Sequence, residues 1–149
     1  MEHRLLDQVK TVMRVMLISE RTSPEHRHVI RFNALDFHTL AIVRTAPGVR
    51  ATAVAAQLGV APTTASSVIA RLVSRGLIQR QQCSQDRRAY ELDLTDEGRA
   101  VADAIHTQDL RNMALFLSAL SAREQTQLVA LMDKVVERVA ALEAGTPSG

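Results

Sequence analysis

The stretch Leu58–Thr95, LGVAPTTASSVIARLVSRGLIQRQQCSQDRRAYELDLT, decides the fold of this 149-residue chain. Its first half is a turn followed by a helix of about residues 62–75, and Gly76 ends that helix. Beyond the glycine the pattern changes, and residues 77–78 and 90–94 are typical of two short strands. The polar segment CSQDRR between them predicts the loop of a hairpin. The stretch therefore predicts a helix that is followed at once by a small antiparallel wing.

A second, shorter helix of about residues 51–58 precedes the first one, and the turn Gly59-Val60-Ala61 joins the two. Pro62 suits the first position of the longer helix, because its fixed φ is already helical. The apolar residues that must lie between the two helices are Ala55, Leu58, Val60, Ala65, Val68, Ile69 and Leu72. This arrangement predicts a helix-turn-helix.

The opposite face of the longer helix is polar. Short hydrogen-bonding side chains lie near its start and cations near its end: Thr63, Thr64, Ser66, Ser67, Arg71 and Arg75. A helix with such a face can enter the major groove of DNA and place its N-terminal residues on base edges. The competing interpretation is a pair of surface helices with solvated polar side chains, which the charged hairpin beside them disfavours.

Positive charge is concentrated in this part of the chain. Residues 50–90 carry six arginines against one carboxylate, Asp86, so the segment is +5 in a chain whose total is +2. Such a concentration indicates a surface that binds phosphate groups. Within it, Arg87 and Arg88 follow Asp86 in the hairpin loop, and arginines on a protruding loop suit phosphate contact or insertion into a narrow minor groove.

Helices flank this unit on both sides. Asp36 can cap one of them, Thr95 another, and Ser121 with Glu124 forms a capping-box pattern at the start of the last. The predicted ranges are about 4–20, 36–46, 95–119 and 121–144.

The composition excludes several classes of protein. Aromatic residues make up 3% of the chain, too few for a base-stacking surface that binds single strands. No apolar run is long enough to cross a bilayer, so we expect no membrane partner. A single cysteine cannot form an internal disulfide, and an acid-bearing N-terminus is unlike a signal peptide, so a cytoplasmic location is expected.

No motif of a common enzyme class is present. The chain has no glycine-rich phosphate loop, no nucleophile elbow, no HExxH and no cysteine pair. We therefore predict that the protein is not an enzyme and uses no cofactor. A metal site from His26, His28 and His38 is a weak hypothesis, because H-x-H in a loop lacks a third ligand, and we predict no metal.

Together, these motifs match the pattern of a known protein family. The run L-G-V-x-P-T-T-x-x-x-x-x-x-R-L-x-x-x-G-L-I-x-R, followed by D-R-R and L-x-L-T-D-E-G, resembles the winged helix-turn-helix of the multiple antibiotic resistance regulator (MarR) family. The resemblance extends from about Leu35 to Gly98, and the flanking helices have the family's layout. It implies a mainly α fold with a small β-wing (α+β), in which N- and C-terminal helices form a dimerisation domain.

The resemblance also implies the domain boundaries and the function. Residues 33–98 would form the winged helix-turn-helix DNA-binding domain, residues 1–32 and 99–144 the dimerisation helices, and residues 145–149 a disordered tail. The expected function is that of a sequence-specific, double-stranded-DNA-binding transcriptional regulator: a ligand-responsive homodimeric repressor on a pseudo-palindromic operator. The alternative is a winged-helix interaction module or antagonist that does not bind DNA.

Family roles transfer to individual residues. Thr63, Thr64, Ser66 and Ser67 would face the major groove, and Arg88 would enter the minor groove. Asp86 would brace the wing, by an ion pair to Arg71 or Arg75, or else is a simple turn residue. Two further choices stay open: Arg87 is a phosphate contact or solvated, and Arg50 contacts phosphate or only weakens a helix cap, where a threonine or serine is usual.

The terminal helices carry apolar stripes that one subunit cannot bury entirely, which predicts a twofold dimer. The expected dimer residues are Leu5, Val9, Val12, Leu128, Leu131, Val135 and Leu142. The resemblance places effector pockets between the dimerisation helices and the winged domain. The residues that could line one are Met13, Met16, Phe32, Phe37, His38, Met113 and Phe116, although side chains of these types more often serve ordinary core packing. Redox sensing at Cys83 is a weaker hypothesis, because peroxide-sensing relatives carry their cysteine in the N-terminal helix.

Overall fold

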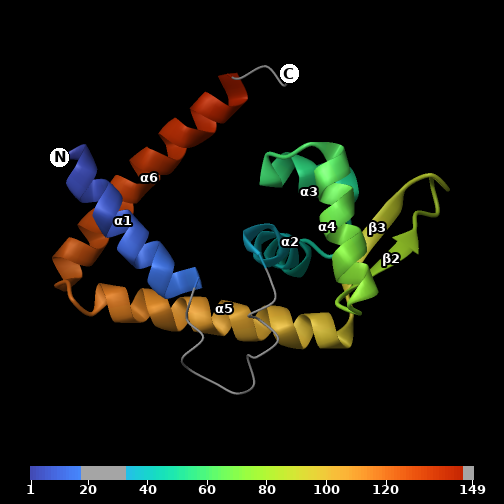
Figure 1. Cartoon of the computed structure of the whole chain (residues 1–149), viewed down its shortest axis with the longest axis horizontal. Helices are drawn as coiled ribbons and strands as arrows, with labels where there is room; N and C mark the ends of the chain where they lie inside the picture. Colours follow the sequence, from blue (N-terminus) through green and yellow to red (C-terminus); the bar gives the residue numbers. More distant parts are fainter. Residues whose placement is uncertain (18–32, 146–149) are drawn as a thin grey trace. The chain divides into compact units, whose positions relative to one another are not determined.

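The computed structural model describes residues 1–17 and 33–145, which form six helices and three strands (Figure 1). Their bounds are α1 Glu2–Leu17, α2 Ala34–Thr45, β1 Val49–Arg50, α3 Ala51–Leu58, α4 Pro62–Ser74, β2 Ile78–Gln82, β3 Tyr90–Leu94, α5 Asp96–Leu117 and α6 Ala122–Gly145. The chain divides into two compact units, Met1–Asp109 and Leu110–Gly149, and the boundary falls inside α5. The fold is mainly helical with a small β-wing, as predicted.

The turn between α3 and α4 has the predicted form. Gly59 adopts the left-handed conformation with φ of 67°, which a residue with a Cβ rarely adopts. The N–H of Val60 donates to the carbonyl of Ala55 and closes the end of α3. The chain then bends by 113° between the two helices, which is the geometry of a helix-turn-helix.

The sheet has three antiparallel strands in the order β1-β3-β2. In β2 and β3, Ile78 pairs with Leu94, Arg80 with Leu92, and Gln82 with Tyr90. Paired residues share a face, so Ile78, Leu92 and Leu94 all point into the core. The predicted strand at 77–78 is therefore too short, since β2 continues to Gln82. Strand β1 was not predicted, because two residues show no alternating pattern.

The core lies between α2, α3, α4 and the inner face of the sheet. The apolar side chains that are at most 3% exposed in this cluster are Leu40, Val43, Val54, Val68, Ile69, Leu72, Leu77, Ile78 and Leu92. Five of the predicted contacts between α3 and α4 (Ala55, Ala65, Val68, Ile69 and Leu72) are buried. Burial of this cluster fixes the outward face of α4.

Helix α2 begins earlier than predicted. Its cap is Asn33, whose side chain accepts a hydrogen bond from the N–H of Asp36 at 3.0 Å. The carboxylate of Asp36 returns the bond by accepting from the N–H of Asn33. Asp36 is thus the third residue of a capping box rather than the cap itself. The prediction was wrong because an aspartate suits both positions.

The later helices begin as predicted. Thr95 Oγ1 accepts from the N–H of Gly98 at the start of α5. At α6, the N–H of Ser121 donates to the carboxylate of Glu124 at 2.8 Å, which completes the capping box. This backbone hydrogen bond lowers the pKa of the Glu124 carboxyl. Helix α5 ends at Leu117, two residues before the expected Ala119.

Within the described ranges, no single helix has the length and apolar character needed to cross a membrane. The bent pair α3 and α4 meets that criterion jointly, by length and composition alone.

Gly98 lies against the backbone where β2 begins. A Cβ at this position would lie 1.8 Å from the carbonyl oxygen of Leu77, and backbone cannot move aside as a flexible side chain can. We expect Gly98→Ala to lower the free energy of unfolding by about 2–4 kcal/mol. Gly145→Ala is the control, because no atom lies within 4 Å of a Cβ there. Urea denaturation measures both, and equal stabilities would contradict this packing.

Candidate nucleic-acid interface

Helix α4 presents a polar face to solvent. Thr63, Thr64, Ser66 and Ser67 are all exposed, as are Ala61 and Pro62 just before them. The hydroxyl of Ser67 donates to the carbonyl of Thr63 at 3.0 Å, so it lies back along the helix. All four predicted groove-facing side chains are therefore free of the core, and their hydroxyls can reach a ligand.

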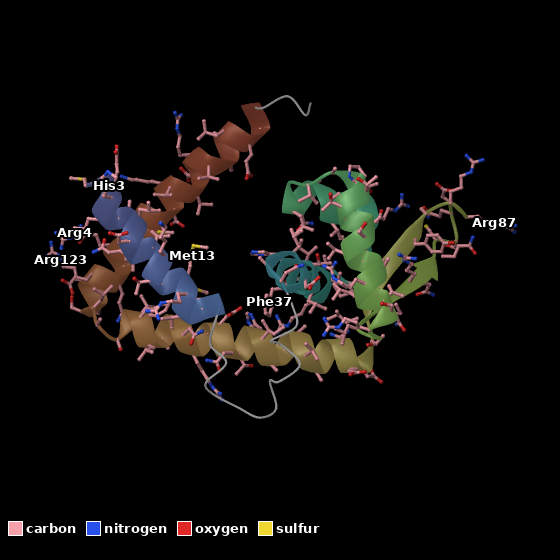
Figure 2. The ribbon with its side chains drawn as sticks, in the orientation of Figure 1. His3, Arg4, Met13, Phe37, Arg87 and Arg123 are labelled. Carbon is pink, nitrogen blue, oxygen red and sulfur yellow. The ribbon has the colours of Figure 1, made fainter. Side chains whose placement is uncertain are left out.

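The wing is held in shape by its own turn. The N–H of Ala89 donates to the carbonyl of Asp86, and the N–H of Arg88 donates to the Asp86 carboxylate at 2.9 Å. The side chain of Gln82 donates to the carbonyl of Arg87 at 2.7 Å. Figure 2 shows Arg87 at the far end of the hairpin, pointing away from the sheet. Asp86 therefore has a partner within the loop, and Arg87 and Arg88 are both exposed.

Arg71 does not lie where the sequence suggested. Its Nε and Nη2 donate to Oδ1 of Asp36 at 3.2 and 2.5 Å. The carboxylate that pairs with Arg71 is therefore Asp36 and not Asp86. Helical spacing placed Arg71 on the outer face of α4, but it could not show that a buried carboxylate of α2 lies beside that face.

The Asp36 carboxylate is almost fully buried, with 2% of its side chain exposed, whereas 42% of the Arg71 side chain is exposed. Three N–H groups, from Asn33 and twice from Arg71, satisfy it. A buried charge needs such compensation, because its loss of hydration is costly. The pair therefore links the first turn of α2 to the last turn of α4.

Arg50 occupies the cap position of α3 without a side-chain capping hydrogen bond. Its Nη2 lies 3.6 Å from Sγ of Cys83 at the base of the wing, within hydrogen-bond distance for sulfur. Cys83 is 5% exposed, and its N–H pairs with the carbonyl of Ala89. Arg50 thus connects the β1–α3 junction to the wing.

A groove of about 460 Å³ lies between α4 and the wing. Its lining residues are Arg50, Ala51, Thr52, Ser66, Ile69, Arg80, Asp86, Arg88, Ala89, Tyr90 and Leu92. We call it the α4–wing groove. Three arginines face one carboxylate there, so the groove favours an anion.

Arg80 was counted in the charge of the segment but was not predicted as a site residue. The signal that could have found it is the alternation along β2, which puts Ile78, Arg80 and Gln82 on one face. The predicted strand ended at Ile78, and this face was therefore missed. Tyr90, which is 48% exposed, was missed for the same reason, since it pairs with Gln82.

Comparison with known proteins agrees with this geometry. A model of the MarR family matches residues 32–90. The HTH-type transcriptional regulator PecS of Dickeya dadantii (strain 3937) is 29% identical over 130 residues, 85% of this chain and 78% of PecS. The HTH-type transcriptional regulator YkoM of Bacillus subtilis (strain 168) is 30% identical over 116 residues, 78% of this chain and 73% of YkoM. The chain belongs to the MarR family.

Solved structures share the fold. FabT of Streptococcus pneumoniae, in a complex with DNA, has a TM-score of 0.83 at 20% identity, covering 95% of this chain and 99% of FabT. PcaV of Streptomyces coelicolor, in a complex with its natural ligand, has a TM-score of 0.62 at 27% identity, covering 91% of this chain and 89% of PcaV. This protein is a MarR-type transcriptional regulator, and its relatives are regulators rather than enzymes.

The predicted dimer residues of this MarR-family chain are all exposed. Leu5, Val9 and Val12 on α1 and Leu128, Leu131, Val135 and Leu142 on α6 have 40–59% of their surface accessible. Along the described part of α6 no residue is buried. Each helix therefore carries an apolar face that the single chain leaves in contact with water.

The predicted effector residues differ in burial. Met16, Phe37 and Phe116 are half-buried, Met13, His38 and Met113 are exposed, and Phe32 lies outside the described residues, as do His26 and His28. Burial raises the pKa of Asp109, and His106 and His38 act in the opposite direction. Among the described residues, no group of three His, Cys, Asp or Glu side chains could hold a metal ion.

The buried Asp36–Arg71 pair predicts that replacing Arg71 lowers the free energy of unfolding more than replacing Arg44 does. Arg71→Met leaves a buried carboxylate with one hydrogen-bond donor, and we expect a loss of about 1–3 kcal/mol in the free energy of unfolding. Arg44→Met is the matched control, because its partner Asp103 is half-exposed and can be hydrated. We expect about 0–1 kcal/mol there, and an equal loss for both variants would refute the buried link.

Proposed function

We propose that this protein is a homodimeric repressor that binds a pseudo-palindromic operator in duplex DNA and releases it when a small-molecule effector binds. The observation that carries the proposal is the exposed polar face of α4 beside a wing whose loop carries the exposed Arg87 and Arg88, with Arg87 at its far end (Figure 2). A helix in the major groove and an arginine in the adjacent minor groove can read base edges and groove shape together.

A pseudo-palindromic operator requires a dimeric protein. A twofold dimer presents two α4 helices to successive major grooves about 34–36 Å apart, so a palindromic operator matches the symmetry of the protein. The apolar faces of α1 and α6 support this assembly, because large exposed apolar surfaces mark protein contacts. Residues 1–32 and 99–144 would then form the dimerisation domain and residues 33–98 the DNA-binding domain.

The effector part of the proposal has a different support. PcaV, a structural neighbour at 27% identity, is known in complex with its natural ligand. In the present chain, Phe37 is half-buried, and a side chain of this type can adapt to an apolar ligand. Since the operator is chromosomal DNA, the proposal places the protein in the cytoplasm.

Selection of genomic fragments by the purified protein, followed by sequencing, tests the proposal and yields the operator. A repressor enriches fragments with an inverted repeat, and its affinity falls steeply from low to moderate salt. An interaction module enriches no fragment and prefers no duplex at any salt.

Arg88→Ala tests the wing. We expect operator affinity to fall by about 1–3 kcal/mol, roughly 5- to 150-fold, with the mass of the dimer unchanged. Fluorescence anisotropy with a labelled operator measures the affinity. Arg123→Ala removes the same charge from the first turn of α6 and should leave the affinity within about twofold of the native value. Native affinity in Arg88→Ala would rule out the wing contact.

Leu131→Glu combined with Val135→Glu tests the dimer face of α6. Both side chains are more than half exposed in the single chain, so the charges cost little in the monomer but would be buried in the dimer. We expect light scattering to report the monomer mass. Thr126→Glu, on the opposite side of the helix, should stay dimeric. A double variant that remains a dimer would show that α6 does not form the interface.

A further inference from the structure

We propose that the α4–wing groove binds the DNA backbone strand that separates the major groove from the minor groove, with Arg80 as a phosphate contact on its floor. This inference rests on the proposed function and adds to it a site that lies between the two parts that read DNA. Its occupant is a phosphodiester group, recognised by charge and hydrogen bonding and not by base sequence.

The α4–wing groove lies where a DNA backbone strand would pass. On duplex DNA, one sugar-phosphate strand runs along the border between a major groove and its neighbouring minor groove. If Ser66 of α4 faces the major groove and Arg88 of the wing enters the minor groove, this strand must cross the space between them. Ser66 of α4 and Arg88 of the wing both line the α4–wing groove, so a strand that passes between them meets the groove.

The groove carries positive charge that no carboxylate of the described residues neutralises by an ion pair. Within residues 1–17 and 33–145, the Arg50, Arg80 and Arg88 guanidinium groups have no carboxylate within ion-pair distance. Asp86 lines the groove as well, but its Oδ1 already accepts the N–H of Arg88. Arg80 therefore presents its charge to the groove, and a guanidinium matches the geometry of two phosphate oxygens.

The sheet and two buried apolar side chains position Arg80. It is paired with Leu92 across the sheet, so its side chain rises from the face on which α4 packs. Ile69 and Leu92, each 1% exposed, form an apolar base beside it. Such surroundings support the aliphatic part of the arginine while its head stays in water. The exposed Tyr90 lines the same groove.

Arg80→Gln separates this role from base recognition. Loss of one phosphate contact should weaken binding by a similar factor, about three- to tenfold, on the operator and on an unrelated duplex. It should also reduce the slope of log affinity against log salt by about 0.9. Arg80→Lys keeps the charge and should keep the slope. Arg99→Gln removes an exposed arginine from the first turn of α5 and should leave both quantities unchanged.

A chemically modified operator locates the contact. A single methylphosphonate at the phosphate between the two grooves removes one negative charge, and it should weaken the native protein about as much as Arg80→Gln does. In combination, the two changes should weaken binding no more than either alone, because they remove the same interaction. Thermal unfolding confirms that the exposed substitution leaves the fold intact.

Several results would overturn the inference. They are a native salt slope in Arg80→Gln, a loss confined to the operator, or additive effects of the variant and the methylphosphonate. A different result would assign a small-anion site instead. Inorganic phosphate, at constant ionic strength, would then stabilise the native protein but not Arg80→Gln, and Arg80→Gln would keep the native DNA affinity. If the native protein binds no duplex, the proposed function fails and not this site alone.

Discussion

The pairing of one buried carboxylate with the recognition helix is the constraint on which the winged unit depends. Asp36 is held from one side by the cap of α2 and from the other by the guanidinium of Arg71 on α4. Apolar contacts between α2, α3 and α4 are not directional and tolerate some rotation, whereas a carboxylate with three donors does not. Burial of the apolar cluster sets which face of α4 points outward, and the Asp36–Arg71 pair adds a directional contact that uses a charge inside the protein.

This use of Arg71 changes how the positive charge of the segment is divided. Arg71 is committed to Asp36, and Arg50 is in contact with Cys83 at the base of the wing. Arg80 and Arg88 face the α4–wing groove, and Arg87 extends from the tip. The helix then offers short hydroxyl side chains, while the wing and β2 offer the cations. Under the proposed function, affinity comes mostly from phosphate contacts and groove shape, and base-edge contacts by α4 select among sequences.

The apolar faces of α1 and α6 stand in contrast to this well-packed unit. Buried apolar side chains are concentrated between α2 and β3, and the terminal helices have few. An exposed apolar face of this kind marks a protein contact, and under the proposed function a second copy of the chain supplies a self-complementary partner. The proposed dimer would then be stabilised by a core within each subunit for the winged unit and by an interface between subunits for the terminal helices.

The sequence by itself determined those features that depend on neighbouring residues. The end of α3 at Gly59, the start of α4 at Pro62 and the capping box at Ser121 follow from local backbone and hydrogen-bond constraints, and all three are confirmed. The order of such local signals along the chain predicted the helix-turn-helix and the hairpin after it. Only the tertiary structure decided that Arg71 pairs with Asp36, that β1 joins the sheet, and that Arg80 faces a groove. These depend on residues brought together from distant parts of the chain, and neither periodicity nor charge count specifies which opposite charge will lie within reach of a guanidinium.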